Sequence, residues 1–165
     1  MDQQPISNYV TASVPGESNQ GDERRTTKAA FPRSGRLLRH ADFERVYKQG
    51  RRHFSASMTV FYLPRQEPVV AKAAAVSGLR VGFTVGRALG GAVQRNRMKR
   101  RLREAVRLTR PSPAPSADVV INPKKVLLTN DFEAVVNEVR RAFVVIDQKL
   151  THKEMKGREP ESGSR

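Results

Sequence analysis

Apolar residues alternate with polar or small residues in two segments of the chain, which is the period of a β-strand. Residues 54–63 predict a half-buried strand with a mixed second face, and its apolar face carries Phe54, Ala56, Met58, Val60 and Tyr62. Residues 80–86 predict another strand, in which Val81, Phe83 and Val85 share a face. The opposite face is small at Gly82, so a neighbouring element can lie close to that backbone. A short apolar run at residues 118–121 predicts a third, buried strand.

Three other segments repeat apolar residues every three or four positions, as helices packed on a core do. Residues 37–49 predict a short helix that ends at Gly50 and carries Phe43, Val46 and Tyr47 on one stripe. Val46 is assigned to the core, whereas the two aromatic residues fit a core and a groove about equally well. A central helix runs from about residue 92 to the prolines at 111–115, with a core stripe of Met98, Leu102, Ala105, Val106 and Thr109. The last helix opens at Asn130, with Glu133 in the capping-box position, and its core stripe is Phe132, Val135, Val136, Val139, Phe143 and Ile146.

Strand, helix and strand with an extra helix at each end predict an α/β sandwich of one small sheet and about three helices. Residues 69–76 are apolar enough to begin a further strand. By the general rule for such crossovers, the connection through the central helix is right-handed. Residues 1–35 and 151–165 are polar and are expected to be a disordered extension and a disordered tail. Residues 36–150 are expected to form one domain.

The positive charge of the chain is concentrated in the predicted domain. The formal net charge is +15 and the isoelectric point is near 11.2, and residues 36–150 contribute +14 of that charge. Residues 87–110 contain nine basic residues and one acidic residue, Glu104. The face of the central helix opposite its core stripe carries Asn96, Lys99, Arg100, Arg103 and Arg107. Like charges four residues apart repel, so this face indicates a polyanionic partner, either nucleic acid or an acidic membrane surface.

Residue types that would support catalysis are scattered along the sequence. The chain has no cysteine, and His40, His53 and His152 have no metal-ligand spacing. The pairs Asp42/Glu44 and Asp131/Glu133 lie near helix starts, where the helix dipole favours acidic residues. No phosphate-binding glycine motif is present. Without a signal peptide or an apolar run of about 18 residues, we expect a cytoplasmic nucleic-acid binder that carries no catalytic residue of its own.

The segment GFTVGRALGGAVQRNRMKRRLRE, at residues 82–104, resembles the signature of the bacterial ribonuclease P protein component. The resemblance extends upstream to Asp42-Phe43, Val46-Tyr47 and Gly50, and downstream to Asp118 and its strand, so it covers about residues 36–150. It implies an α+β two-layer sandwich with a small, mostly antiparallel four-stranded sheet. It also implies a left-handed crossover through the basic helix, which replaces the right-handed expectation.

The resemblance further implies a function. The family's holoenzyme hydrolyses one phosphodiester bond to remove the 5′ leader of precursor tRNA, and its RNA subunit is the catalyst and holds most of the Mg²⁺. By position, the residues expected to bind the RNA subunit are Arg87, Arg95, Asn96, Arg97, Lys99, Arg100 and Arg103. The residues expected to line a leader-binding cleft are Phe43, Tyr47, Thr59 and Phe61. The expected partners are therefore the RNA subunit and precursor tRNA, with no membrane and no obligate protein partner.

Two positions depart from the family pattern. Ala88 stands where a second basic residue usually follows Arg87, and Lys124 stands where an arginine is common. Arg101 and Arg110 are interpreted as a solvated flank of the basic helix.

The main alternative function is a structured-RNA binder of ribosomal type with the same fold. A DNA regulator is a weaker alternative, because no helix-turn-helix pair precedes the basic helix.

Overall fold

The computed structural model describes residues 31–66 and 78–156, so the apolar run at residues 69–76 lies outside the described residues. Its three α-helices are α1 (His40–Gln49), α2 (Ala92–Thr109) and α3 (Phe132–Lys156). Its four strands are β1 (Arg51–Phe54), β2 (Met58–Pro64), β3 (Leu79–Phe83) and β4 (Ala117–Pro123). Three short 3₁₀ helices join them: η1 (Arg33–Gly35), η2 (Arg87–Leu89) and η3 (Lys125–Leu128).

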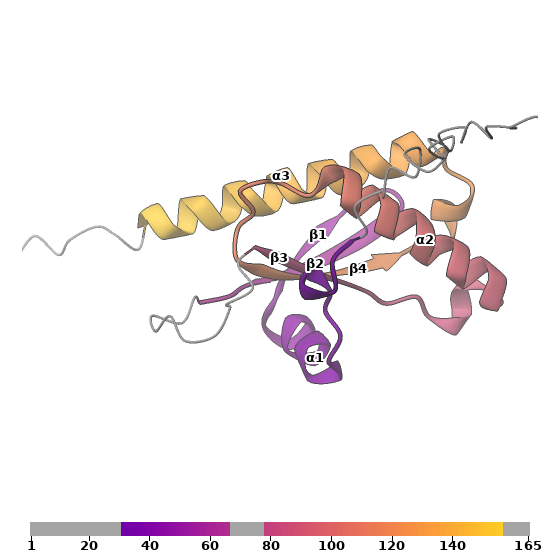
Figure 1. The fold of residues 1–165 in the computed structure, drawn as a ribbon, viewed down its shortest axis with the longest axis horizontal. Helices are drawn as coiled ribbons and strands as arrows, with labels where there is room; N and C mark the ends of the chain where they lie inside the picture. Colours follow the sequence, from indigo (N-terminus) through magenta and orange to yellow (C-terminus); the bar gives the residue numbers. More distant parts are fainter. Residues whose placement is uncertain (1–30, 67–77, 157–165) are drawn as a thin grey trace, which may run out of the picture.

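The four strands form one mixed sheet in the order β1-β2-β4-β3. The β1–β2 and β2–β4 pairs are antiparallel, and β3 pairs with β4 in parallel. The chain passes from β3 to β4 through α2, which is the crossover that the family resemblance predicts to be left-handed (Figure 1). The expected fold, a small and mostly antiparallel four-stranded sheet with three helices, is confirmed.

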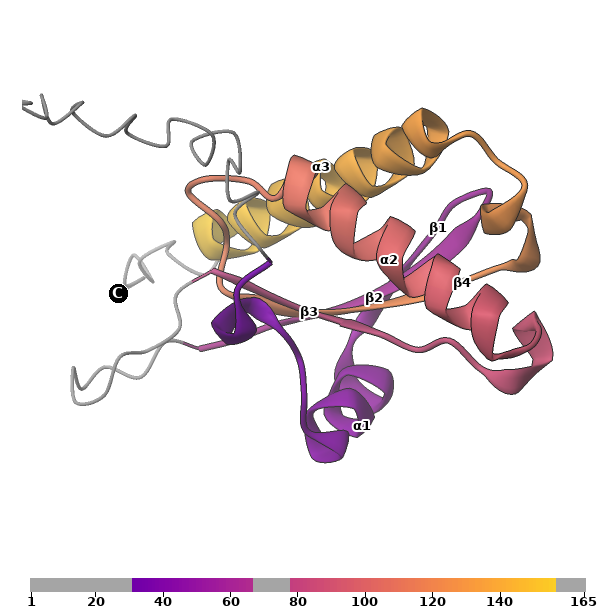
Figure 2. The same cartoon turned by 45° about the vertical axis from the view of Figure 1, so that its right-hand side comes forward.

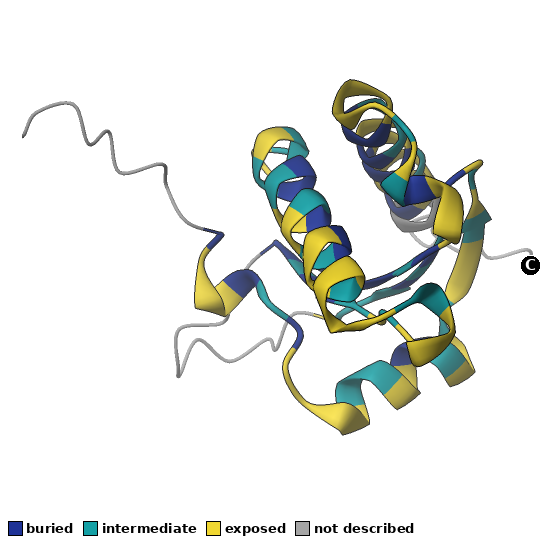
Figure 3. Ribbon diagram, turned by 90° about the vertical axis from the view of Figure 1, so that its right-hand side faces the viewer, coloured by how far each residue is buried: buried dark blue, intermediate teal, exposed yellow. Residues whose placement is uncertain are grey.

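Helices cover both faces of this sheet. Helices α2 and α3 lie side by side on one face, and α1 lies on the other (Figure 2). The main core fills the space beneath α2 and α3, and a smaller apolar cluster of Leu37, Val46 and Val120 lies beneath α1. The two-layer description is therefore corrected to helix, sheet and helix. The buried stripes of α2 and α3 face the sheet and their exposed residues face outward (Figure 3).

The single strand predicted for residues 54–63 is wrong, because the chain reverses within it. Strand β1 ends at Phe54 and β2 begins at Met58, with the N–H of Ser55 donating to the Met58 carbonyl at 3.0 Å. Phe54 pairs with Thr59, and residues that pair across an antiparallel hairpin share a face. The reversal therefore moves Phe54 to the face opposite Met58 and Val60, which a single alternating strand could not show. Met58, Val60 and Tyr62 are buried as expected, whereas Phe54 is exposed.

The ordered part of the chain is wider than the interval 36–150. Phe31 and Gly35 are buried, and α3 continues to Lys156, so residues 151–156 are helical rather than a disordered tail. The last helix begins at Phe132 rather than Asn130, and the Phe132 side chain is 37% exposed instead of belonging to the core. The rest of the predicted stripes of α2 and α3 is buried, except for a half-buried Thr109.

Arg101 and Arg110 anchor the middle and the C-terminal end of α2 and are not a solvated flank. Arg101 donates to the backbone carbonyls of Leu127 and Leu128 in η3 and of Asn130. Arg110 donates to the Leu79 carbonyl at 2.8 Å and lies over the ring of Phe31. These contacts attach α2 to η3 and to the start of β3 through backbone carbonyls, which the several N–H donors of a guanidinium can reach together.

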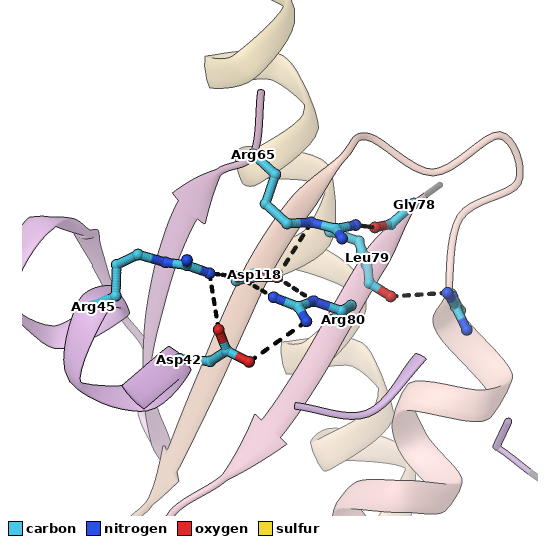
Figure 4. A network of polar contacts seen from close by, with 8 residues as sticks. Asp42, Arg45, Arg65, Gly78, Leu79, Arg80 and Asp118 are labelled. Atoms are coloured by element: carbon cyan, nitrogen blue, oxygen red, sulfur yellow. Dashed lines mark hydrogen bonds and ion pairs between the residues drawn. The ribbon is translucent and has the colours of Figure 1, made fainter. Parts of the chain in front are cut away.

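A buried carboxylate joins α1 to the sheet (Figure 4). Asp118 of β4 is fully buried and contacts three guanidinium groups: Arg80 Nε and Nη2, both at 2.7 Å, Arg45 Nη2 at 2.9 Å and Arg65 Nε at 3.2 Å. Asp42 of α1 adds contacts to Arg45 at 3.0 Å and to Arg80 at 3.5 Å. The hydrogen bonding of Arg80 to the Asp118 carboxylate, which accepts, is the main cause that raises the pKa of Arg80, against the lowering effect of burial. The network therefore ties α1, β3 and β4 together.

A second buried contact fixes the β1–β2 turn to α3. The Glu138 carboxylate accepts hydrogen bonds from the Ser55 hydroxyl at 2.7 Å, the Ser57 N–H at 3.0 Å and the Ser57 hydroxyl at 2.8 Å. Burial alone raises the pKa of Glu138, but these hydrogen bonds and the nearby charge of Lys124 outweigh it, and the pKa is lowered. The ionised form is thus the one that the turn binds.

We predict that Asp118→Asn lowers the free energy of unfolding by about 3 kcal/mol, because it leaves the partly buried guanidinium groups of Arg65 and Arg80 without their counter-charge. Urea denaturation followed by circular dichroism measures this. Asp147→Asn, at an exposed position of α3, is the matched control and should change stability by less than about 0.5 kcal/mol. Equal effects of the two substitutions would contradict a structural role for the network.

For Glu138 we predict a pH-dependent contribution to stability. Since its pKa is lower in the folded chain than in the unfolded chain, its ionised form stabilises the fold above the ordinary glutamate pKa of about 4.3, and the benefit is lost as pH falls through the folded pKa. The difference in unfolding free energy between wild type and Glu138→Gln should therefore be larger at pH 7 than at pH 3.5. Urea titrations at both values measure it, and a difference that grows on acidification would refute the assignment.

Candidate nucleic-acid interface

The basic helix α2 begins after a pair of glycines, and the local backbone requires the first of them, Gly90. Gly90 has φ +133°, a conformation that residues with a side chain rarely adopt, and a Cβ there would lie 1.9 Å from Gln94 Oε1. That same oxygen accepts the N–H of Gly91 at 2.9 Å, which closes the first turn. The helix ends at Thr109, before Pro111. Its position and length are therefore fixed by local sequence at both ends.

The structure gathers the predicted RNA-subunit residues on α2 or just before it. Arg87 in η2 and, on α2, Asn96, Arg97, Arg100 and Arg103 are exposed, and Arg95 and Lys99 are half-buried. Within the described part of the chain, none of these seven side chains forms an ion pair, whereas Arg107 is bound to Glu104 at 2.6 Å. The Nε of Arg95 is buried without a hydrogen-bond partner in the described structure.

This face concentrates uncompensated positive charge. The pKa of Arg101 is lowered chiefly by burial and further by the charge of the neighbouring Arg97, against a raising effect of Asp131. Guanidinium groups form paired hydrogen bonds to phosphate oxygens. The exposed face of α2 is thus suited to contact a phosphate backbone.

The predicted leader-binding residues lie on the other face of the sheet, where α1 packs. The rings of Tyr47 and Phe61 meet edge to face, with centroids 4.8 Å apart and planes at 76°. The Tyr47 hydroxyl lies 2.8 Å from both Asn122 Oδ1 and Thr84 Oγ1. Because an amide oxygen only accepts, the hydroxyl donates to Asn122 and receives the hydrogen bond of Thr84. The Tyr47 ring is therefore fixed in direction.

The sequence did not decide whether Phe43 and Tyr47 belong to the core or line a groove, and the structure shows features of both. Both are half-buried and pack against the apolar cluster under α1, so neither is a fully buried core residue. The ring of Phe43 fills the space over Gly82, where a Cβ would lie 2.5 Å from its Cζ, as the small face of that strand predicted. Thr59 is half-buried on β2, directly opposite Asn122 on β4.

Asn122 and Thr84 are the cleft residues that the sequence analysis missed. Asn122 was interpreted only as the end of a strand. The alternation of β4 puts Asp118, Val120 and Asn122 on one face, but only the strand order places that face beside Tyr47.

The residues at the two departures from the family pattern have different surroundings. Ala88 is exposed in η2. The Nζ of Lys124 donates to the Ser55 carbonyl at 2.8 Å, so this lysine supports the β1–β2 turn.

Other features of the described residues lie apart from both surfaces. A cavity of about 630 Å³ between the β1–β2 turn and α3 is lined by none of the predicted site residues. Among the described residues no group of three or more His, Asp or Glu side chains is placed to hold a metal ion. No described helix is both long enough and apolar enough to cross a membrane.

A family model and individual relatives all match this chain to ribonuclease P proteins. The family model for ribonuclease P matches residues 31–147. The ribonuclease P protein component of Citrifermentans bemidjiense is 38% identical over 117 residues, which is 71% of this chain and 92% of that protein. The one from Chloroflexus aggregans is 44% identical over 88 residues, and the chain covers 53% of its own length and 58% of that protein's.

Solved structures of ribonuclease P proteins share the fold. The protein from Thermotoga maritima in complex with 1-(4-fluorophenyl)-2-thiourea superposes with a TM-score of 0.54 at 25% identity, covering 66% of this chain and 96% of that one. A Staphylococcus aureus protein superposes with a TM-score of 0.54 at 23% identity, covering 68% and 94%. With a family model that covers most of the chain and a relative matched over nearly its whole length, the chain belongs to the ribonuclease P protein component family.

Proposed function

We propose that this chain, as the protein subunit of ribonuclease P, binds the catalytic RNA subunit through α2 and the 5′ leader of precursor tRNA through the cleft under α1. The observation that carries the proposal is that one small domain presents two chemically different surfaces on opposite sides of its sheet. One is a helix face whose predicted RNA-binding side chains form no ion pair among the described residues, and the other is a cluster of aromatic and polar side chains beside α1.

The α2 surface supports binding to a structured RNA. Arg97, Arg100 and Arg103 are exposed on a helix whose opposite stripe is fully anchored in the core, so the helix need not be ordered on binding. Asn96 adds a neutral donor and acceptor suited to a base edge or a 2′-hydroxyl. Each phosphate contact releases counterions, so this affinity falls steeply with salt.

The cleft supports binding to a single-stranded leader. Unpaired bases stack on aromatic side chains for about 1–3 kcal/mol each, with little dependence on sequence. The ring of Phe61 lies on the sheet, and the ring of Tyr47 lies beside it on α1. Hydrogen bonds to Asn122 and Thr84 hold Tyr47 in place. Tolerance of sequence suits a protein that meets the leaders of many different precursors.

The proposal assigns hydrolysis to the RNA subunit and its Mg²⁺ ions, with no reacting group from this chain. The two carboxylates nearest the cleft, Asp42 and Asp118, are engaged by arginines and do not fit a magnesium site. The contribution of the chain is to bind and orient the two RNAs, which lowers the entropic part of the barrier.

A reconstitution assay tests the proposal. The chain is mixed with a bacterial ribonuclease P RNA and a precursor tRNA at low Mg²⁺, where RNA alone cleaves slowly. We expect faster cleavage and tighter binding of precursor than of mature tRNA. If the chain binds the RNA without accelerating cleavage, the alternative of a ribosomal-type RNA binder is the better description.

The salt dependence of binding tests the role of α2. Arg100→Ala with Arg103→Ala should lower affinity for the RNA subunit and reduce the slope of log affinity against log salt by about 0.7–0.9 per lost phosphate contact. The double variant Arg140→Ala with Arg141→Ala, on exposed positions of α3, is matched in charge and should change the slope less. Equal slopes for the two variants would place the RNA elsewhere.

A further inference from the structure

The exposed aromatic residue Phe54 lies at the outer edge of the sheet. Strand β1 is an edge strand, and the Phe54 side chain is 68% exposed, the largest exposure of any aromatic residue in the described core domain. A large apolar group left in water at a sheet edge favours association. Neither the main core nor the cluster under α1 includes it.

Three observations place the Phe54 side chain on the cleft face of the sheet. Its cross-strand partner is Thr59, and paired residues of an antiparallel ladder share a face. Arg52, two residues earlier on the same strand, lies over the ring of Phe61 with its Cζ 5.4 Å from the centroid. Ser55, the next residue, reaches Glu138 on the opposite face. Phe54 also lines the cavity beside α3, together with His53 and Ser55, so this residue at the end of the edge strand borders both sides of the sheet.

The surroundings of Phe54 favour single-stranded RNA as the ligand. Phe54 and Phe61 are diagonal neighbours across β1 and β2, a separation of about 7–8 Å over which aromatic side chains can act together. Arg52 stands beside them, exposed, and forms no ion pair or hydrogen bond with any residue that the structure describes. Helix α1 packs on β2 and β4, so β1 stays open. Phe54, the guanidinium of Arg52 and Phe61 therefore lie next to one another. The two rings can stack on bases while the guanidinium contacts a phosphate.

We propose that Phe54 and Arg52 extend the leader-binding cleft onto the edge strand, where Phe54 stacks on one leader nucleotide beyond those held by Tyr47 and Phe61. This rests on the proposed function, since it assumes that the leader occupies the cleft. It adds a binding position on a strand that the predicted cleft did not include.

The test uses the reconstituted holoenzyme and precursor tRNAs whose leaders lengthen one nucleotide at a time. For the wild-type protein, the affinity for precursor tRNA should rise as each of several successive leader nucleotides is added. Phe54→Ala should lose about fivefold in affinity or more, only for precursors that contain its nucleotide, and at a leader length different from that affected by Phe61→Ala. Phe54→Trp should restore the loss, because it restores a stacking surface.

Two controls separate the possible failures. Val144→Ala removes an exposed apolar side chain on the cavity side, at α3, and should leave every leader length unchanged. If Phe54→Ala changes no affinity by more than twofold, or weakens precursor and mature tRNA alike, or if Val144→Ala reproduces its effect, the extension is refuted. If wild type itself gains nothing from a longer leader, the proposed function of the cleft fails instead.

Discussion

The buried carboxylate of Asp118 is the contact on which the arrangement of α1 and the sheet depends. It is fully buried, and the guanidinium groups of Arg45, Arg65 and Arg80 converge on it from α1, from the end of β2 and from β3. A lone buried charge would be very costly. Here the charge is compensated only when all three segments are in place, so the carboxylate specifies one docking of α1 on the sheet.

That docking determines the geometry of the cleft. The apolar cluster beneath α1 is small, with Leu37, Val46 and Val120 fully or nearly fully buried, and would allow some sliding of a ten-residue helix. The ionic network at one end and the Tyr47 hydroxyl at the other remove that freedom. Tyr47 and Phe61 therefore present a preformed surface, which lowers the entropic cost of ordering a flexible RNA strand on it.

The sequence predicted those features that depend on local periodicity. The stripe of α2, the burial of Val81 and Val119 and the close approach to Gly82 follow from the pattern of apolar and small residues. The reversal at Ser55 did not follow, because the sequence alternates across the turn as it would in one strand, although the pairing of Phe54 with Thr59 puts Phe54 on the opposite face. The interpretation of Arg101 as solvated failed because its partners are backbone carbonyls 26 and more residues away.

The site residues also divide into those that local periodicity predicts and those that depend on how distant segments come together. Basic residues of α2 could be assigned to one face from helical spacing alone, since a single element carries them. The cleft joins α1, β2, β4 and the segment after β3, so the partners of Tyr47 could be found only once the strand order was known. The role of Asp118 was hidden for the same reason.

The short connection between β3 and α2 links the two surfaces mechanically. Thr84, which contacts Tyr47 in the cleft, is followed within a few residues by η2 and then by Gly91 at the start of the basic helix. With α2 packed on the sheet through Met98, Leu102 and Val106, the distance between cleft and helix face is set by the fold. Under the proposed function, this fixed distance would hold the leader at a constant offset from the RNA subunit.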